Sequence, residues 1–101
     1  MDVSVRTESD RCVIQVAGRF DFNAHREFRD AITKSLAQVG VPQIQVDLGE
    51  VGYLDSSALG MLLMARDKAR SAGKTVSLIN TRGSVRQVLD IANFGRLFPI
   101  S

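Results

Sequence analysis

The spacing of apolar residues changes several times along this chain, and no other feature restricts its fold as much. Apolar residues alternate with polar ones in 3–5 and 44–48, and β-branched residues are prominent in 13–16 and 75–79. Alternation with a period of two and β-branched runs are typical of strands. The pattern predicts strands in all four segments, and the third is expected to end in a turn at Gly49-Glu50.

Helical spacing is found between these strands. Apolar residues recur every three or four positions from Asn23 to Val39, where Gly40 ends the pattern, and again over 84–92. Asn23 and Ser84 are residue types that favour helix N-caps. The sequence therefore predicts one helix after the second strand and another after the fourth.

A further helix is predicted in the middle of the chain, from Asp55 or Ser56 to about Arg70, with Gly73 as its stop. After the first two strands, strands and helices then alternate, which is the pattern of an α/β protein. We expect a small mixed sheet of four or five strands flanked by helices. A length of 101 residues corresponds to a single domain over 1–101.

Composition limits the possible locations of the protein. The longest purely apolar run, 61–65, falls far short of the roughly 20 residues that a membrane-spanning helix needs. Polar and apolar residues alternate near the start of the chain, unlike in an export signal. The lone Cys12 cannot form an internal disulfide and lies in an apolar run, so we expect it in the core. These features predict a cytoplasmic protein without direct membrane insertion.

Few side chains are suited to chemistry. The single histidine, His25, has no neighbour spaced to form a nucleophile–base pair, and one histidine with one cysteine cannot supply a common metal site. No glycine-rich nucleotide loop follows a strand. The densest basic stretch, 66–74, has no aromatic residues for base stacking, which argues against nucleic acid as a partner. We expect no enzyme activity, cofactor or metal.

The most informative segment is 47–60, which runs from a strand through a turn into a helix. It places Ser56 and Ser57 at a helix N-terminus, where backbone N–H groups lack intrahelical partners and the helix dipole is positive. A phosphate on a serine would be partly stabilised there. The simpler alternative is that Asp55 or Ser56 only caps the helix.

The segment Asp55-Ser56-Ser57-Ala58-Leu59-Gly60 resembles the phosphorylation motif of bacterial STAS-domain anti-sigma-factor antagonists. The similarity extends from 18–21 to 85–89 and 97–98. It implies that a partner kinase modifies Ser56, with Ser57 as its neighbour and Asp21 as a nearby acidic residue. Ala58 replaces the glycine that is usual in the family, and its methyl group puts the close approach of a kinase backbone in doubt.

The resemblance also implies a mechanism of partner switching. The unphosphorylated protein binds a serine protein kinase of the anti-sigma type, which releases its target, and phosphorylation by that kinase ends the binding. A serine phosphatase resets the cycle. The modification adds about −1.5 to −2 charges beside Asp55 and Asp21, in a surface that must be desolvated for docking.

Two other functions remain open on the sequence alone. The same switch can act on a non-sigma effector that regulates biofilm formation, motility or a second messenger. Alternatively, the chain is a non-catalytic subunit of a membrane transporter assembly. Ser56 argues mildly against the transporter alternative, because relatives of that kind often carry threonine at the corresponding position.

Helix geometry indicates which surface the partner contacts. At about 100° per residue, one face of the central helix carries an apolar stripe that should pack on the sheet. The opposite face carries the candidate phosphosite and possible partner contacts: Ser56, Gly60, Leu63 and Asp67, with Met64 adjoining. Either the third helix or the C-terminal tail covers Leu63 and Met64, or these two side chains form an exposed anchor for the kinase.

Overall fold

Four strands form one mixed sheet in the order β1-β2-β3-β4. The computed structural model describes residues 1–101, and its strands are β1 (Asp2–Glu8), β2 (Arg11–Phe20), β3 (Gln43–Leu54) and β4 (Thr75–Ile79). β1 is antiparallel to β2, whereas β2, β3 and β4 are mutually parallel. The predicted α/β class and mixed sheet are confirmed.

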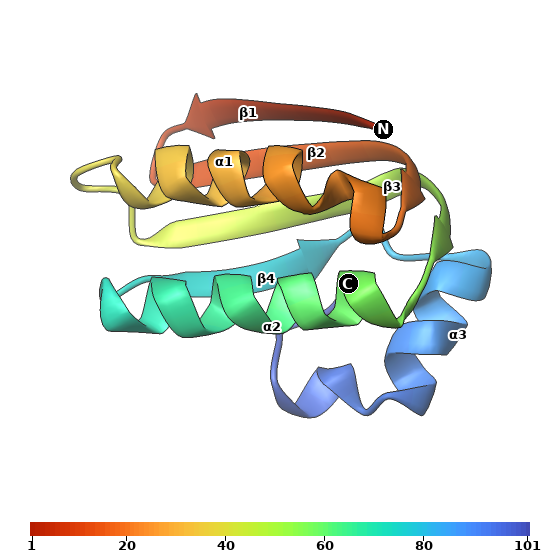
Figure 1. Cartoon of the computed structure of the whole chain (residues 1–101). Helices are drawn as coiled ribbons and strands as arrows, with labels where there is room; N and C mark the ends of the chain where they lie inside the picture. Colours follow the sequence, from red (N-terminus) through yellow and green to blue (C-terminus); the bar gives the residue numbers. More distant parts are fainter.

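Three α-helices connect or follow these strands: α1 (His25–Leu36), α2 (Ser56–Ser71) and α3 (Gly83–Ile91). Short 3₁₀ helices precede α1 and follow α3, namely η1 (Phe22–Ala24) and η2 (Phe94–Arg96). Figure 1 shows α1 and α2 side by side across the same face of the sheet, with α3 at one end of the molecule. No helix combines the length and apolar character that crossing a bilayer requires.

The core lies between the sheet and these helices. Ile14, Val46 and Leu78 from neighbouring strands are fully buried there, and Phe28 of α1 and Leu62 of α2 close it from the helical side. Cys12 is buried and unpaired, as predicted. The alternating and helical apolar patterns therefore converge on one packed layer.

The predicted turn at Gly49-Glu50 is wrong, because β3 continues through it to Leu54. The strand accommodates this segment with two register shifts against β2, between Gln15 and Ala17 and between Gly18 and Arg19. At each shift β3 has one extra residue, which is the definition of a β-bulge. A Cβ at Gly49 would lie only 3.1 Å from Asp47 Oδ1 and 3.2 Å from Asn80 Cβ, so a glycine suits this bulge.

The predicted bounds of the first and third helices also need correction. The first begins as η1, where the Asp21 side chain accepts a hydrogen bond from the Asn23 N–H, so Asp21 is the cap instead of Asn23. The α-helix ends at Leu36, and Val39 is 98% exposed rather than part of the buried stripe. Likewise, α3 begins at Gly83, one residue before the predicted cap Ser84.

The C-terminal tail, which the sequence did not resolve, adds a short bridge to the free edge of β4. Ile100 pairs with Leu78 in parallel, and the Leu78 N–H donates to the Pro99 carbonyl at 2.9 Å. The Arg66 Nε also donates to the Leu97 carbonyl at 2.9 Å, which ties the tail to α2. The tail therefore covers the edge of β4, whereas the outer edge of β1 has no such cover.

Candidate functional site

Two aspartates meet where the neighbouring parallel strands β2 and β3 end. Asp21 follows β2 and Asp55 follows β3, and the Asp55 N–H donates to the carbonyl of Phe20 at 3.3 Å. The β3 bulges bring this end into register, because Phe20 of β2 pairs with Leu54. The structure thus brings together the two acidic residues that the sequence placed near the phosphosite.

Each aspartate caps the helical segment that follows it. Asp21 Oδ1 accepts from the Asn23 N–H at 3.0 Å, and Asp55 Oδ1 accepts from the Ala58 N–H at 3.0 Å. Arg19 lies against the same corner, with its Nε 3.5 Å from Asp21 Oδ2. Both carboxylates are therefore held in place by local hydrogen bonds next to the start of α2.

Ser56 is the first residue of α2, and it is exposed together with Ser57. Because Asp55 is the N-cap, the hydroxyl of Ser56 is not required for capping. The N–H groups of Ser56 and Ser57 belong to the first turn, where no intrahelical acceptor exists. The geometry gives an accessible hydroxyl at the positive end of a 16-residue helix.

Ala58 and Gly60 lie on opposite sides of α2. The side chain of Ala58 is completely buried in the core, so its methyl group is not on the surface that a partner would approach. The burial of this methyl group argues against the expected obstruction of a kinase backbone. Gly60 is exposed, and a Cβ built there would meet nothing within 4 Å.

The remaining residues of the predicted partner face differ in their packing. Asp67 is exposed, and Leu63 is half-buried and packs against the core cluster. Met64 is also half-buried but is not among the side chains packed on that cluster. The sequence left two alternatives for Leu63 and Met64, namely burial under the third helix or the tail, and free exposure. Neither alternative describes both side chains. Met64 is the more available of the two.

Two aromatic residues near the site were missed by the sequence reasoning. Phe22, in η1 directly after Asp21, is 68% exposed, and Tyr53, near the end of β3, is 42% exposed. The guanidinium carbon of Arg19 lies 4.1 Å from the centroid of the Tyr53 ring. The available signal was local: Phe22 lies between Asp21 and Asn23, outside the helical stripe that begins at Phe28.

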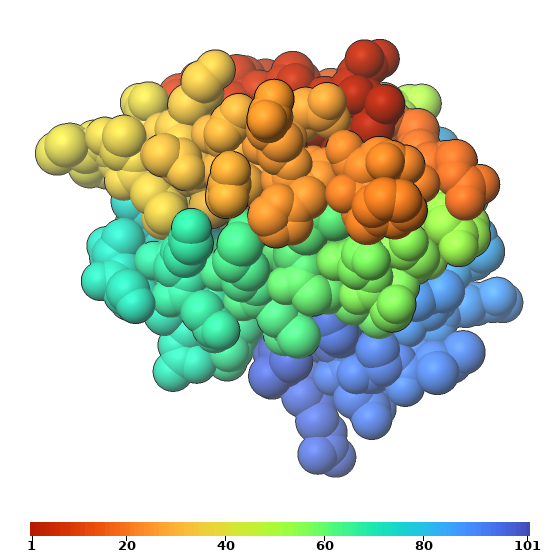
Figure 2. Space-filling view, in the orientation of Figure 1, coloured from red at the N-terminus to blue at the C-terminus, as the bar shows by residue number.

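Asp21, Asp55 and Ser56 lie where β2 and β3 end and the helical segments η1 and α2 begin. Figure 1 shows that α2 begins at the end of the sheet where η1 lies, and Figure 2 shows the surfaces of the two helical segments meeting there. Two capped helix starts, the exposed Ser56 and the exposed Phe22 thus lie at this end, whereas Tyr53 belongs to the face of β3 opposite the buried Leu54. Such a surface can contact a protein partner and can carry a phosphate, and it offers no nucleophile–base pair.

The protein-family model described as "Mlab, STAS domain" matches residues 3–99. The chain belongs to the STAS-domain family. This STAS domain is 46% identical over 94 residues to a STAS-domain containing protein of Pseudomonas aeruginosa, and the match covers 93% of this chain and 91% of that protein. The resemblance seen in the sequence is confirmed at the level of the family.

Solved structures show the same fold at lower sequence identity. An anti-sigma factor antagonist from Mycobacterium paratuberculosis has a TM-score of 0.85 at 22% identity, covering 98% of this chain and 83% of that one. The Bacillus cell fate determinant SpoIIAA in its phosphorylated form has a TM-score of 0.74 at 20% identity, covering 99% and 91% of the two chains. The STAS domain therefore shares its architecture with anti-sigma factor antagonists.

Proposed function

We propose that this STAS domain is a partner-switching regulator controlled by phosphorylation of Ser56. The unphosphorylated form binds a serine protein kinase of the anti-sigma type and so frees the target that the kinase otherwise holds. The same kinase phosphorylates Ser56, which ends the binding, and a serine phosphatase restores the starting state. The chain itself acts as a binding partner and not as an enzyme.

One observation carries this proposal more than any other: Ser56 is exposed at the N-terminus of α2 while Asp55 does the capping. A serine that is not required for local structure can be modified without loss of the helix. The unpaired N–H groups of the first turn can donate to phosphate oxygens. The family membership and the solved phosphorylated form of SpoIIAA, which has the same fold, support control by phosphorylation.

Electrostatics explains why the modification would end binding. A phosphoserine carries about −1.5 to −2 charges at neutral pH. At Ser56 this charge would lie beside Asp55 and close to Asp21, whose side chain is only 15% exposed. A partner that covers the site must desolvate all three negative groups, which is costly without matching cations. Binding and phosphorylation therefore exclude each other.

The docking surface extends beyond the serine. Phe22 and Tyr53 are the exposed aromatic side chains next to the two aspartates, and aromatic residues often dominate binding energy in interfaces. Gly60 and Met64 lie on the next turns of α2 toward its C-terminal end. We expect the kinase to contact Phe22, Tyr53 and the exposed side of α2.

The released target need not be a sigma factor. A non-sigma effector of biofilm formation, motility or second-messenger signalling would use the same switch, because the output protein contacts the kinase rather than this surface. A role as a non-catalytic subunit of a membrane transporter assembly has no feature of the site in its favour. Proteins captured with the Ser56→Ala variant would distinguish these outputs.

The decisive experiment uses two matched variants, Ser56→Ala and Ser57→Ala. Neither serine is buried, so both variants should fold like the wild type. Ser56→Ala cannot be switched off and should retain the kinase in a pull-down from the native cell. The purified kinase with ATP should then phosphorylate wild type and Ser57→Ala, but not Ser56→Ala. Fragment mass spectrometry that places the phosphate mainly on Ser57, or on neither serine, would refute the proposal.

A further inference from the structure

The outer edge of β1 is unpaired along its whole length. β1 (Asp2–Glu8) is the first strand in the sheet order, and β2 occupies only its inner edge. Backbone N–H and C=O groups of such an edge readily pair with another strand. No proline, bulge or covering loop blocks this edge, so it can accept a strand.

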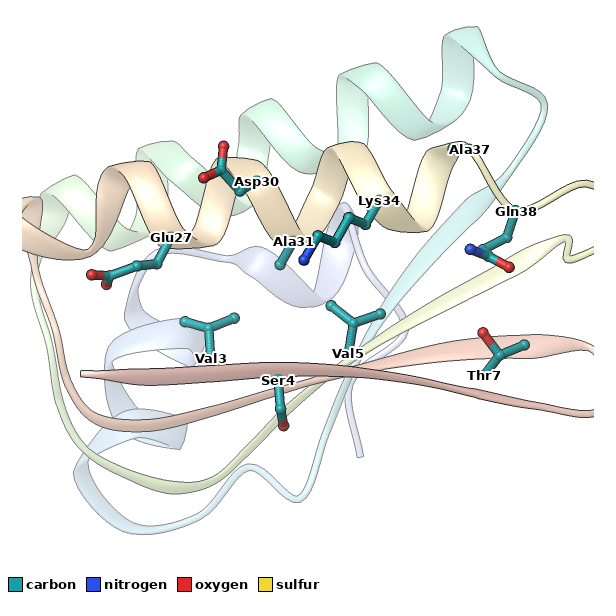
Figure 3. Close-up of a pocket in the computed structure, with 10 residues that line it drawn as sticks. All are labelled: Val3, Ser4, Val5, Thr7, Glu27, Asp30, Ala31, Lys34, Ala37 and Gln38. Carbon is teal, nitrogen blue, oxygen red and sulfur yellow. The ribbon is translucent and has the colours of Figure 1, made fainter.

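Beside this edge, an open groove of about 650 Å³ separates β1 from α1. Figure 3 shows Val3 and Val5 pointing from β1 toward α1, whereas Ser4 points to the opposite side of the sheet. Both valines are only half-buried, although they pack against the core. Glu27 and Lys34 of α1 lie along the groove, near Val3 and Val5 respectively.

We propose that the occupant of this edge is β1 of a second copy of the chain, paired in the antiparallel direction. The two copies are related by a two-fold axis through Ser4, perpendicular to the sheet. This register pairs Val3 with Val5 of the partner copy, and Asp2 with Arg6 of the partner copy, each contact occurring twice. The Arg6 guanidinium also contacts Glu8 of its own strand through Nε, at 2.6 Å, which leaves its other N–H groups for Asp2. The apolar row and the charged row of the edge strand are therefore both self-complementary.

Neighbouring registers do not have this property. A two-fold axis through Val5 would place Asp2 opposite Glu8 twice, and an axis through Arg6 would place two guanidinium groups opposite each other. An axis through Val3 would place Asp2 opposite Ser4 and lose both Asp2–Arg6 pairs. Like charges in directly opposite positions destabilise strand pairing. The sequence of β1 thus selects the register centred on Ser4.

Two charges of α1 independently favour the same axis, while Asp30, which also lines the groove, points away from β1 in Figure 3. Because Glu27 lies near Val3 and Lys34 near Val5, pairing Val3 with Val5 of the partner copy brings Glu27 opposite Lys34 of the partner copy. An axis through Val5 would instead bring the two Lys34 side chains together. Because α1 contacts both β1 and β2, an axis beside β1 brings the two α1 helices next to each other on the same face of the extended sheet.

Cysteine cross-linking tests the register directly. Ser4 and Arg6 are both exposed on the same face of β1, and native Cys12 is fully buried. In the proposed dimer Ser4 opposes its own copy, at a Cα separation of about 4.5–5.5 Å, which a disulfide can bridge. The matched Arg6→Cys variant would place its two cysteines about 14 Å apart along the strands, too far for a bond. Because this variant also loses the Asp2–Arg6 pairs, its rate is measured at a concentration at which sedimentation velocity shows it to be dimeric.

Under mild oxidation, Ser4→Cys should form a disulfide dimer at least about tenfold faster than Arg6→Cys, with circular dichroism confirming that both variants fold. Equal rates, faster Arg6→Cys cross-linking or no cross-linking of Ser4→Cys would overturn the proposal. Sedimentation velocity of the wild type should show a fraction of dimer that increases with protein concentration. A monomer at every concentration would mean that a different partner, or none, pairs with the β1 edge, and this result would also overturn the proposal.

Charge reversal tests the helical contact. Glu27→Lys or Lys34→Glu alone should weaken the dimer by about fivefold, because each change alters two symmetric pairs. The double variant restores both pairs and should return to near the wild-type dissociation constant. Lys68→Glu on the exposed part of α2 is the control and should have no effect. Failure of the double variant to recover would contradict the proposed axis.

Discussion

At the scale of single residues, Asp55 and Ser56 have separate roles although they are adjacent. Asp55 caps α2 through the Ala58 N–H, which leaves Ser56 exposed and available for modification. Gly60 follows one turn later with open space where a side chain would be. Nothing in the folded chain requires a glycine there, so a requirement for it would come from the partner.

The Gly60→Ala variant tests this point. Alanine stabilises a helix interior by about 1 kcal/mol relative to glycine, and the added methyl meets no atom within 4 Å. We expect a higher free energy of unfolding in urea together with weaker kinase binding. If binding is unchanged, the partner backbone does not approach α2 at Gly60.

Leu63 and Met64 are expected to respond differently to the same substitution. Leu63→Gln should lower the free energy of unfolding by about 2 kcal/mol, because the side chain packs against the core. Met64 is outside that cluster, so Met64→Gln should change stability by less than about 0.5 kcal/mol and should weaken kinase binding. Thermal melts with paired affinity measurements separate the two effects, and equal destabilisation by both variants would assign Met64 to the core.

At the scale of elements, the dipole of α2 is expected to tolerate charge at one end only. Ser56 and Ser71 are the first and last residues of this helix, and both are exposed. Negative charge is favourable near a helix N-terminus and unfavourable near its C-terminus, by about 0.3–1 kcal/mol. Ser56→Asp should therefore leave stability unchanged or slightly raised, since adjacent Asp55 offsets part of the gain. Ser71→Asp should lower the free energy of unfolding, measured in urea at low salt. A lower stability of Ser56→Asp than of Ser71→Asp would show that the N-terminus of α2 does not stabilise a negative charge.

Most elements were predictable from apolar spacing because each buries a simple face. The apolar stripe predicted for the central helix is the buried face of α2, where Ala58, Leu62, Ala65 and Ala69 are fully buried. The end of β3 was not predictable, since Gly49 and Glu50 look like a turn when read locally and become part of a bulged strand only through pairing with β2. Ser84 was likewise a reasonable local cap, although α3 begins without a side-chain cap bond.

The candidate site was predictable in its motif but not in its surroundings. Asp55, Ser56 and Ser57 follow one another in the sequence, so helix-start rules apply to them directly. The contact between Asp21 and this motif depends on the hydrogen bond between Asp55 and Phe20, which joins two strand ends distant in sequence. The exposure of Phe22 and Tyr53 follows from the same packing and has no periodic signal.

At the scale of the whole molecule, the end opposite the site is held by a buried lysine. Lys74, which follows α2, is 9% exposed and donates from Nζ to the carbonyls of Gln38 and Val41, both at 2.6 Å. It thereby joins the connection after α1 to the connection after α2. The length of α2, about 24 Å, separates these hydrogen bonds of Lys74 from Ser56.

The Lys74→Met variant should therefore affect stability alone. It leaves two carbonyls without their donor and should lower the free energy of unfolding by about 2 kcal/mol. Kinase affinity, measured well below the melting temperature, should stay the same. Lys68→Met on exposed α2 is the control and should be near neutral in both measurements. A loss of affinity in Lys74→Met would show that the two ends of the molecule are coupled.

The central claim is that phosphate on Ser56 and partner binding exclude each other. Isothermal titration of the kinase, in the presence of ADP, with unphosphorylated and with stoichiometrically Ser56-phosphorylated protein tests it most directly. We predict at least tenfold weaker binding of the phosphorylated form, about 1.4 kcal/mol or more, because the added charge must be desolvated beside Asp55 and Asp21. Equal affinities of the two forms would contradict the account.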